Sequence, residues 1–370
     1  METPAWAVVE LAAVRHNVAL LREKAAGAQL MAVVKADGYG HGMVPCAVAA
    51  LEAGADWLGV VQVGEALRLR AAGITAPVLC MMAIPGAAYE EAVRAGVDVS
   101  AGSTGMVADI AAAAARAGRP ARLQLKADTG LSRGGATARA WPAVVDAALA
   151  GQAAGHLEIT GLWSHLAAAD LPGHPSIARQ LDAFAWALAG AEKAGAKPEI
   201  RHIANTAAAL TLPAARFDLV RPGGAIYGLS TLPGGPPPEF RPAMTLRTRL
   251  AQVKRVPPGT GVSYGHTYVT AAEAALGLLP LGYADGVPRV ASGQPLVQAR
   301  GRRWTVAGTV CMDQFVVDFG SEPVTAGDEV VLFGPGDQGE PTAQEWADTL
   351  RTISYEIVTG IGNRVARVYC

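Results

Sequence analysis

Short apolar runs recur along the first two thirds of the chain, and stretches of helical character rich in alanine, leucine and arginine separate most of them. Continuous apolar runs of this length are typical of strands buried on both faces of a parallel sheet. Eight strands are predicted, at residues 30–36, 57–61, 77–81, 97–101, 121–126, 157–165, 200–205 and 217–227. Eight such strands alternating with helices favour an α/β fold, a (β/α)₈ barrel of the TIM type. A doubly wound sheet, which usually has fewer strands, is the structural alternative.

The pattern changes near residue 231. Residues 231–239 contain three consecutive prolines and a glycine pair, which cannot continue a helix or a central strand, so we expect a linker there. Beyond it, the pattern predicts strands at 246–256, 276–281, 296–310, 315–319, 329–333 and 366–369, with short helices at 342–350 and 353–359. We therefore expect a barrel at residues 1–232 and a β-rich C-terminal domain at residues 233–370.

Polar residues interrupt this pattern at the predicted strand ends, where a barrel enzyme builds its active site. They are Lys35, Lys126 with Arg133, His165, Asn205 with Thr206, and Arg221. Lys35 ends a β-branched run and precedes a loop with three glycines and Tyr39. A lysine in such a place is paired, used covalently, or held at a depressed pKa for chemistry. The alternative is a lysine that extends from the strand end into solvent.

Composition narrows the classes of partner. The chain has 31 Lys and Arg against 32 Asp and Glu, and no basic block, so we expect a small-molecule partner and no nucleic acid. No apolar run approaches the ~20 residues of a transmembrane helix, and the opening Met-Glu-Thr-Pro lacks a cationic signal region. We expect a cytoplasmic protein without membrane contact. The four cysteines lack CxxC spacing, and we expect no metal site.

Nine segments carry a closer resemblance. They are AVVKADGYGHG (32–42), LKADTGLSR (125–133), GLWSHLA (161–167), HIANTAA (202–208), VRPGGAIYG (220–228), VSYG (262–265), LGYADG (281–286), VCMDQ (310–314) and ISYE (353–356). In this order they resemble the alanine racemase family, the fold-type III pyridoxal-phosphate enzymes, over nearly the whole chain. The resemblance implies a barrel followed by a β domain, pyridoxal 5'-phosphate as cofactor, and a homodimer with composite active sites.

The resemblance assigns two bases. It implies that Lys35 holds the cofactor as a Schiff base, and that its freed amine then acts on one face of the substrate's α-carbon. On the opposite face it implies Tyr264, contributed by the partner subunit, with His165 and Arg221 as candidates to stabilise its phenolate. Arg221 would face the pyridine nitrogen and leave it unprotonated. From local sequence alone, a surface tyrosine and a surface ion pair are the alternatives for Tyr264 and Arg221.

The remaining site residues follow from the same resemblance. The implied cofactor-binding set is Lys35, Tyr39, Arg133, His165, Asn205, Thr206, Arg221, Gly223, Gly224 and Tyr355, in which the hydroxyls of Tyr39, Thr206 and Tyr355 and the amides near Gly223 and Gly224 contact the phosphate. The family often has serine at the position of Thr206 and a larger aliphatic residue at that of Gly224. These departures keep the required hydroxyl and amide but leave the local packing open.

The resemblance also implies a substrate-binding set of Arg133, Tyr283, Met312 and Asp313, the last two from the partner subunit. Arg133 would bridge the cofactor's phenolic oxygen and the substrate carboxylate, held by a carbamylated Lys126. A plain surface pair of Lys126 with Asp128 is the local alternative. Tyr283 and Tyr355 would narrow the entrance and favour a small side chain. For His41 and His202 we expect supporting roles only.

Together these features predict a racemase that interconverts L- and D-alanine and supplies D-alanine for peptidoglycan. A related racemase acting on serine or on a broader set of amino acids is the first alternative. A non-catalytic pyridoxal-phosphate carrier on the same barrel is the second, although such carriers resemble the first domain alone. A metal-dependent barrel hydrolase would need clustered histidines and aspartates at the strand ends, and it is poorly supported.

Overall fold

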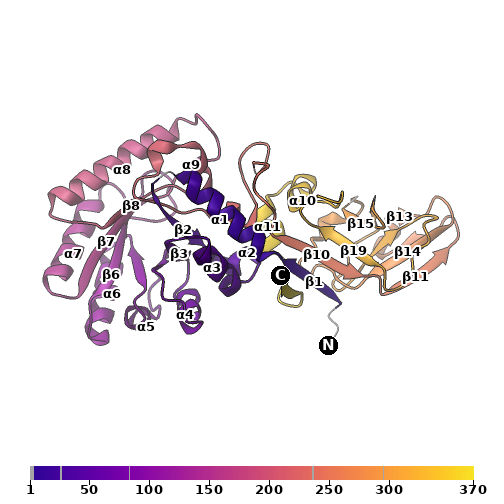
Figure 1. Ribbon diagram of the computed structural model, residues 1–370, viewed down its shortest axis with the longest axis horizontal. Coiled ribbons are helices and arrows are strands. Elements are labelled where there is room, and N and C mark those ends of the chain that lie inside the picture. Colours follow the sequence, from indigo (N-terminus) through magenta and orange to yellow (C-terminus); the bar gives the residue numbers. More distant parts are fainter. Residues whose placement is uncertain (1–3, 26, 83, 236, 295) are drawn as a thin grey trace.

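The computed structural model describes residues 4–25, 27–82, 84–235, 237–294 and 296–370. Residues 1–3 of the predicted opening and Pro236 of the predicted linker lie outside these ranges. The molecule has two parts placed end to end, a helix-covered barrel and a β-rich part, with the carboxyl end of the chain at their junction (Figure 1). Among the described residues, none of the helices combines the length and the apolar character that crossing a membrane requires.

Eight parallel strands form the barrel, in the order β8-β7-β6-β5-β4-β3-β2-β9. They are β2 (Gln29–Val33), β3 (Trp57–Val60), β4 (Val78–Cys80), β5 (Asp98–Ala101), β6 (Ala121–Lys126), β7 (Leu157–Trp163), β8 (Ile200–His202) and β9 (Leu219–Val220). Just past the edge strands β8 and β9, Asn205 and Arg221 form a parallel bridge that joins the two ends of the sheet. The predicted barrel is confirmed. Strands β7 and β9 end earlier than predicted, so His165 lies in a loop beyond β7.

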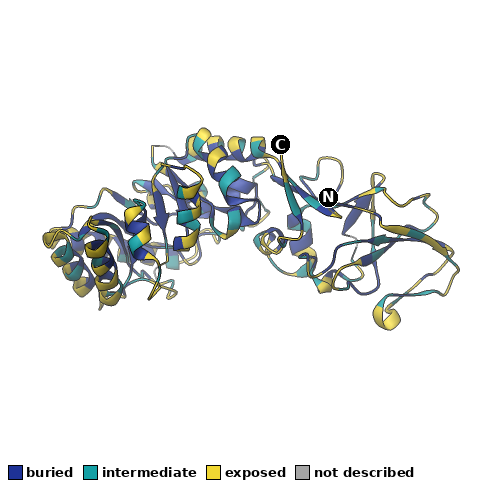
Figure 2. Ribbon diagram, turned by 90° about the horizontal axis from the view of Figure 1, so that it is seen from below, coloured by how far each residue is buried: buried dark blue, intermediate teal, exposed yellow. Residues whose placement is uncertain are grey.

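Helices cover the outside of the barrel and bury one face each (Figure 2). They are α1 (Leu11–Ala25), α3 (Met43–Glu52), α4 (Val63–Ala71), α5 (Tyr89–Arg94), α6 (Thr104–Ala117), α7 (Trp141–Ala153), α8 (Ser176–Lys193) and α9 (Thr206–Thr211). In α6 the buried residues Val107, Ile110 and Ala114 recur at helical spacing. Helix α9 is capped by Asn205, whose Oδ1 accepts from the amide of Ala208 at 3.1 Å. The loops that lead from strands into these helices form the rim that carries the candidate site.

The β-rich part contains a six-stranded sheet ordered β16-β15-β19-β10-β1-β20 and a four-stranded sheet ordered β11-β14-β18-β17, with a small β12-β13 pair. Its strands are β10 (Met244–Arg249), β11 (Gln252–Val256), β12 (Gly261–Val262), β13 (Tyr268–Val269), β14 (Ala274–Leu279), β15 (Val297–Ala299), β16 (Arg302–Trp304), β17 (Val306–Ala307), β18 (Phe315–Asp318), β19 (Glu329–Phe333) and β20 (Ala366–Tyr369). Helices α10 (Ala343–Leu350) and α11 (Ser354–Thr359) lie where they were predicted.

Two predicted strands of this part are wrong as single elements. Residues 246–256 form β10 and β11, which belong to different sheets, and the apolar pattern runs through the change without a turn residue. Residues 296–310 contain three short strands. Between β15 and β16, Arg300 and Gly301 both have positive φ angles, 50° and 71°, as a tight hairpin requires.

Strand β1 (Ala5–Val9) was not predicted. It pairs antiparallel with β10 and parallel with β20 in the six-stranded sheet, and it buries Ala5, Ala7 and Val9. The chain therefore begins in the β-rich sheet before it enters α1 of the barrel, although this strand lies within the range predicted for the barrel domain. Fully buried Asn17 of α1 reinforces the junction, because its side chain donates to the carbonyl of Arg241 at 2.8 Å and accepts from that residue's amide at 2.9 Å.

Candidate active site

Lys35 begins a left-handed turn just after β2. Ala36, Asp37 and Tyr39 have φ angles of 52°, 52° and 53°, and Gly38 has a φ angle of 65°. Left-handed backbone costs about 1–2 kcal/mol for each non-glycine residue, so three of them cost on the order of 3–6 kcal/mol. The three glycines after Lys35 predict a loop but not its hand. A turn of this cost persists only where the surrounding structure holds it.

Side chains from both parts of the molecule hold this turn. The Nδ1 of His41 donates to the carbonyls of Gly38 at 3.1 Å and of Tyr39 at 2.9 Å. Complete burial lowers the pKa of His41 to about 4, so the ring is neutral and keeps that proton on Nδ1. From β20, the Nε of Arg367 donates to the carbonyl of Gly40 at 2.9 Å. The β-rich part thus helps to position the loop that follows Lys35.

The ammonium of Lys35 lies in a partly buried, cationic environment. Burial lowers its pKa, the charge of Arg133 lowers it further, and Glu65 opposes the change. The Lys35 Nζ lies 5.9 Å from the ring centroid of Tyr39. A lysine with a lowered pKa offers more neutral amine at neutral pH, which is the form that attacks a carbonyl or accepts a proton.

Two cations lie over the indole ring of Trp163, at the end of β7. The Nζ of Lys126 lies 4.4 Å from its ring centroid and the guanidinium carbon of Arg221 lies 4.9 Å from it. Burial lowers the pKa of Lys126 to about 8, and Arg133 and Arg221 contribute to the shift. Within the described residues, none of the cations Lys35, Lys126, Arg133 and Arg221 forms an ion pair with a carboxylate. This rim therefore suits an anionic ligand.

Arg221 is buried at the centre of a polar network. Its Nη2 donates to the carbonyl of Ser164 at 2.8 Å and to the Nδ1 of His165 at 3.1 Å, and its Nη1 donates to the Nδ1 of His202 at 2.7 Å. Burial lowers the pKa of Arg221 to about 9, which still leaves it protonated at neutral pH. Burial and Arg221 hold the pKa of both histidines well below the usual range, so each accepts through Nδ1 and carries its proton on Nε2.

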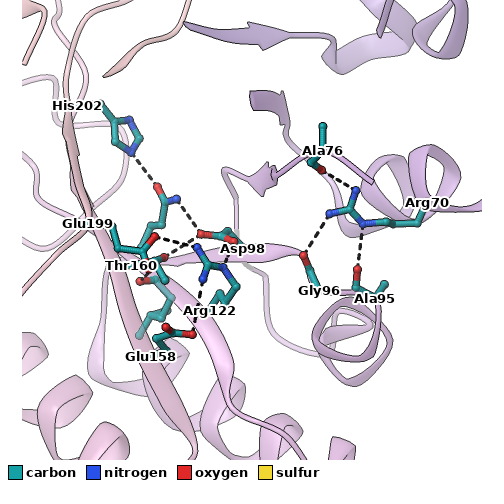
Figure 3. A network of polar contacts seen from close by, with 12 residues as sticks. Arg70, Ala76, Ala95, Gly96, Asp98, Arg122, Glu158, Thr160, Glu199 and His202 are labelled. Carbon is teal, nitrogen blue, oxygen red and sulfur yellow. Dashed lines mark hydrogen bonds and ion pairs between the residues drawn. The ribbon is translucent and has the colours of Figure 1, made fainter. Parts of the chain in front are cut away.

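The network continues through the barrel interior (Figure 3). The Nε2 of His202 donates to the Oε1 of Gln124 at 2.8 Å, and the Nε2 of Gln124 donates to the Oδ2 of Asp98 at 3.0 Å. Asp98 also accepts from the hydroxyl of Thr160 at 2.8 Å and pairs with the Nε of Arg122 at 2.8 Å. This chain of donors and acceptors fixes the tautomer of His202 and, through it, the plane of the Arg221 guanidinium.

Three hydroxyl groups meet beside a pair of glycines. The hydroxyls of Tyr39 and Tyr355 lie where Cβ atoms on Gly223 and Gly224 would be, and the Thr206 Oγ1 accepts from the amide of Gly223 at 2.9 Å. The rings of Tyr39 and Tyr355 pack edge to face with centroids 5.5 Å apart. Burial raises the pKa of both phenols, that of Tyr355 to about 12, so both remain hydrogen-bond donors. Hydroxyl donors and backbone amides of this kind suit a phosphate group.

The predicted β-domain residues have different surroundings. Tyr264, Met312 and Tyr283 are exposed to 73%, 54% and 44%. Asp313 forms an exposed pair with Arg364 at 2.8 Å. Strand β13, which follows Tyr264 closely in sequence, lies at the end of the β-rich part remote from the barrel (Figure 1). Among the described residues of one chain, no hydrogen bond or aromatic contact joins Tyr264 to Lys35.

Comparison with known proteins decides the family. The model of the alanine racemase N-terminal domain matches residues 9–231, and that of the alanine racemase C-terminal domain matches residues 243–369. The chain belongs to the alanine racemase family. An alanine racemase of Thermobifida fusca is 58% identical over 369 residues, covering 100% of this chain and 99% of the relative.

Solved structures of the alanine racemase family agree over the whole fold. That of Streptomyces coelicolor is 56% identical, with a TM-score of 0.97 over 99% of this chain and 98% of the other. That of Bacillus anthracis, solved with bound L-Ala-P, is 33% identical, with a TM-score of 0.91 over 100% of this chain and 96% of the other.

Several residues around the site were missed from the sequence. Asp98 and Gln124 are polar residues inside apolar strands, and the cost of burying them was an available signal. Trp163 lies within a motif of the alanine racemase family quoted above, but it received no role. Glu65 lies three residues after Gln62 at a helix start, which is the spacing of a capping glutamate.

Proposed function

We propose that this protein racemises alanine with pyridoxal 5'-phosphate as cofactor. The observation that carries the proposal is the position of Lys35. It begins a left-handed turn, its amine lies 5.9 Å from the ring centroid of Tyr39, a residue of the hydroxyl-lined cradle, and burial and the charge of Arg133 lower its pKa. Membership of the alanine racemase family supports it, as does the relative from Bacillus anthracis with bound L-Ala-P.

The residues present fit the cofactor. Tyr39, Thr206 and Tyr355, with the amide of Gly224, would hold its phosphate. Gly223 leaves space for the Tyr39 hydroxyl and fixes Thr206 through its amide. Asn205 supports Thr206 by capping α9, while Arg221 and His165 would lie against the ring. When bound, pyridoxal phosphate withdraws electrons from the α-carbon of an amino acid joined to it, which makes the α-hydrogen acidic. Arg221, which stays protonated at neutral pH, would face the ring nitrogen and leave it without a proton.

Two side chains would move the proton. The Nζ of Lys35 takes or gives a proton on one face of the α-carbon, and the phenol oxygen of the partner's Tyr264 does so on the other. His165, which accepts from Arg221 through Nδ1, can donate its Nε2 proton to the phenolate of the partner's Tyr264. A single base could remove and return a proton on one face only, whereas two bases invert the centre.

Arg133 would hold the substrate carboxylate and the phenolic oxygen of the cofactor. Lys126 would support it as a carbamate, formed when its neutral amine attacks carbon dioxide and releases a proton. A pKa of about 8 gives Lys126 the neutral fraction that this addition needs. The new negative charge would relieve the repulsion between Lys126, Arg133 and Arg221.

We also propose a homodimer in which residues 1–232 form the cofactor-binding barrel and residues 233–370, joined by β1, complete the partner's site. The exposure of Tyr264, Met312 and Asp313 supports this arrangement, because side chains that are open in one chain are accessible to a second one. Tyr283 and Tyr355 would narrow the entrance for a small substrate. The D-alanine product would supply peptidoglycan in the cytoplasm.

The test uses the purified holoenzyme and a panel of L-amino acids followed by polarimetry. Alanine should racemise fastest, with serine and larger amino acids slower, and Lys35→Ala should abolish the reaction. A cofactor-loaded protein that leaves L-alanine unchanged, or a Lys35→Ala variant that retains wild-type rates, would overturn the proposal.

A further inference from the structure

We propose that Glu65 is a positioning residue for Lys35, because its carboxylate fastens the left-handed turn after the lysine to the start of helix α4. The inference rests on the proposed role of Lys35. The Oε1 of Glu65 accepts from the amide of Ala36 at 2.7 Å, and its Oε2 accepts from the amides of Val61 at 2.9 Å and Gln62 at 3.0 Å. One side chain thus joins the loops that follow β2 and β3.

The position of Ala36 explains why this contact matters. Ala36 is the first left-handed residue after Lys35, and its amide opens the turn. Without an acceptor at this point, a right-handed path would relieve the strain of the turn and would carry the amine of Lys35 elsewhere. One turn further along α4, Arg68 pairs with Asp37 at 3.2 Å. Helix α4 therefore contacts two consecutive left-handed residues, Ala36 through Glu65 and Asp37 through Arg68.

Charge gives Glu65 a second effect on Lys35. The groups that face the lysine ammonium are Arg133, His165, Tyr39 and Glu65. Burial and Arg133 lower the pKa of Lys35, and Glu65 raises it. Glu65 therefore limits the loss of the ammonium form, which the lysine needs when it returns a proton. A residue that only capped α4 would have no such effect.

The test compares Glu65→Gln, Glu65→Asp and a matched control, Glu345→Gln. Glu345 occupies the same capping position in α10, where its Oε2 accepts from the amide of Thr342 at 2.7 Å, and it is not one of the charged groups that shift the pKa of Lys35. The first readout is the pH midpoint at which an amine-reactive reagent labels Lys35 in the cofactor-free protein, measured by peptide mass spectrometry. The second is the dissociation constant of pyridoxal phosphate.

Glu65→Gln should move the labelling midpoint to lower pH and weaken cofactor binding about tenfold. Glu65→Asp keeps the charge but is one methylene too short for Ala36, so it should weaken binding while its midpoint stays near that of the wild type. Glu345→Gln should change neither. A folded Glu65→Gln protein with the wild-type midpoint and affinity overturns the inference. If that variant does not fold, unchanged affinity in Glu65→Asp overturns it.

Both readouts are independent of turnover, which separates the two proposals. If the wild type does not racemise alanine but both Glu65 variants still bind pyridoxal phosphate more weakly, the proposed function fails and the positioning role stands. If racemisation is normal and neither the midpoint nor the affinity changes in Glu65→Gln, only the positioning role fails.

Discussion

The barrel rim and the β-rich part contribute to the proposed site in opposite ways. On the rim, Lys35, Lys126 and Arg221 are buried or partly buried, and burial shifts the pKa of each. In the β-rich part, Tyr264 and Met312 stand largely in solvent. The rim is thus organised within one chain, whereas in the proposed homodimer Tyr264 and Met312 would acquire their surroundings from the second chain.

This difference has an energetic reason. Four cations act on His165, and two of them also lie over the indole of Trp163. Cations this close repel each other, and an anionic ligand would offset that cost. The three hydroxyls beside Gly223 and Gly224, and the hydrogen-bond network from Arg221 to Asp98, fix the positions of the rim side chains. Little reorganisation is therefore needed when such a ligand binds. Exposed phenols such as that of Tyr264 are not subject to this charge repulsion. A partner subunit that binds without changing shape would bring them to the site.

The largest expected effect comes from separating the two halves. Lys35→Ala and Tyr264→Phe homodimers should each lose activity by about 10³-fold, because each lacks one base in both sites. Subunit exchange between them should restore one intact site in each mixed dimer. With random pairing about half the dimers are mixed, so recovery should approach roughly a quarter of wild-type activity. If mass spectrometry confirms exchange and no activity returns, the two bases act within one chain or Tyr264 is not the second base.

The sequence was sufficient for most of the rim. Polar residues at the ends of apolar strands placed Lys35, Lys126 and Arg221 together, because parallel barrel strands present their carboxyl ends on one face. The motifs of the family then supplied roles that residue type alone could not. The β-rich part was predicted less well, since alternation continues across the break between β10 and β11 and gives no signal of a change of sheet.

Contacts that depend on three-dimensional proximity were not predictable. The hand of the turn at Ala36 and Asp37 follows from contacts that are remote in sequence. An acceptor and a donor come from α4, and a second donor comes from β20. The link from Arg221 through His202 to Gln124 joins three strands, and no local pattern marks it. Strand β1 was missed because five residues carry too little periodicity to be distinguished from a loop.

A charge reversal at Arg221 tests how strictly the rim is organised. Arg221→Glu should slow alanine racemisation by about 10²-fold and raise transamination, measured as pyruvate formed per racemisation event, because a carboxylic acid can protonate the ring nitrogen. Arg221→Lys keeps the charge and serves as the control, with slower racemisation but little pyruvate. An unchanged ratio of the two reactions in Arg221→Glu would show that residue 221 does not face the ring.

Burial of Lys126 and its repulsion by Arg133 and Arg221 predict that the free energy of unfolding depends on pH. The pKa of Lys126 is about 8 in the folded chain against 10.5 for the free side chain, so between these values the unfolded chain binds more protons. The contribution of Lys126 to the free energy of unfolding therefore rises with pH through this window and is least favourable below pH 8. In cofactor-free protein without carbon dioxide, Lys126→Met should add about 1 kcal/mol near neutral pH, after discounting for partial exposure.

This gain in the free energy of unfolding should disappear above pH 10.5, where Lys126 is neutral in both states. Urea unfolding near neutral pH and above pH 10.5 measures the difference. Labelled bicarbonate should give a carbamate carbon signal in the wild type that Lys126→Met lacks. Equal unfolding free energies for both proteins near neutral pH would mean that Lys126 is not strained. A missing carbamate signal would leave the strain unrelieved and remove carbamylation from the mechanism.

The smallest expected effect separates function from structure within the β-rich part, using two tyrosines four residues apart. The hydroxyl of Tyr268 donates to the Oδ2 of Asp318 at 2.7 Å, and partial burial together with this contact raises the pKa of Tyr268 to about 12. Tyr268→Phe should lower the free energy of unfolding by about 1 kcal/mol and leave racemisation unchanged. Tyr264→Phe should do the reverse, because its exposed hydroxyl contributes little to the fold of one chain. Denaturant titration and turnover of both variants measure the contrast, and a Tyr264→Phe protein with normal turnover and reduced stability would place Tyr264 among the structural residues.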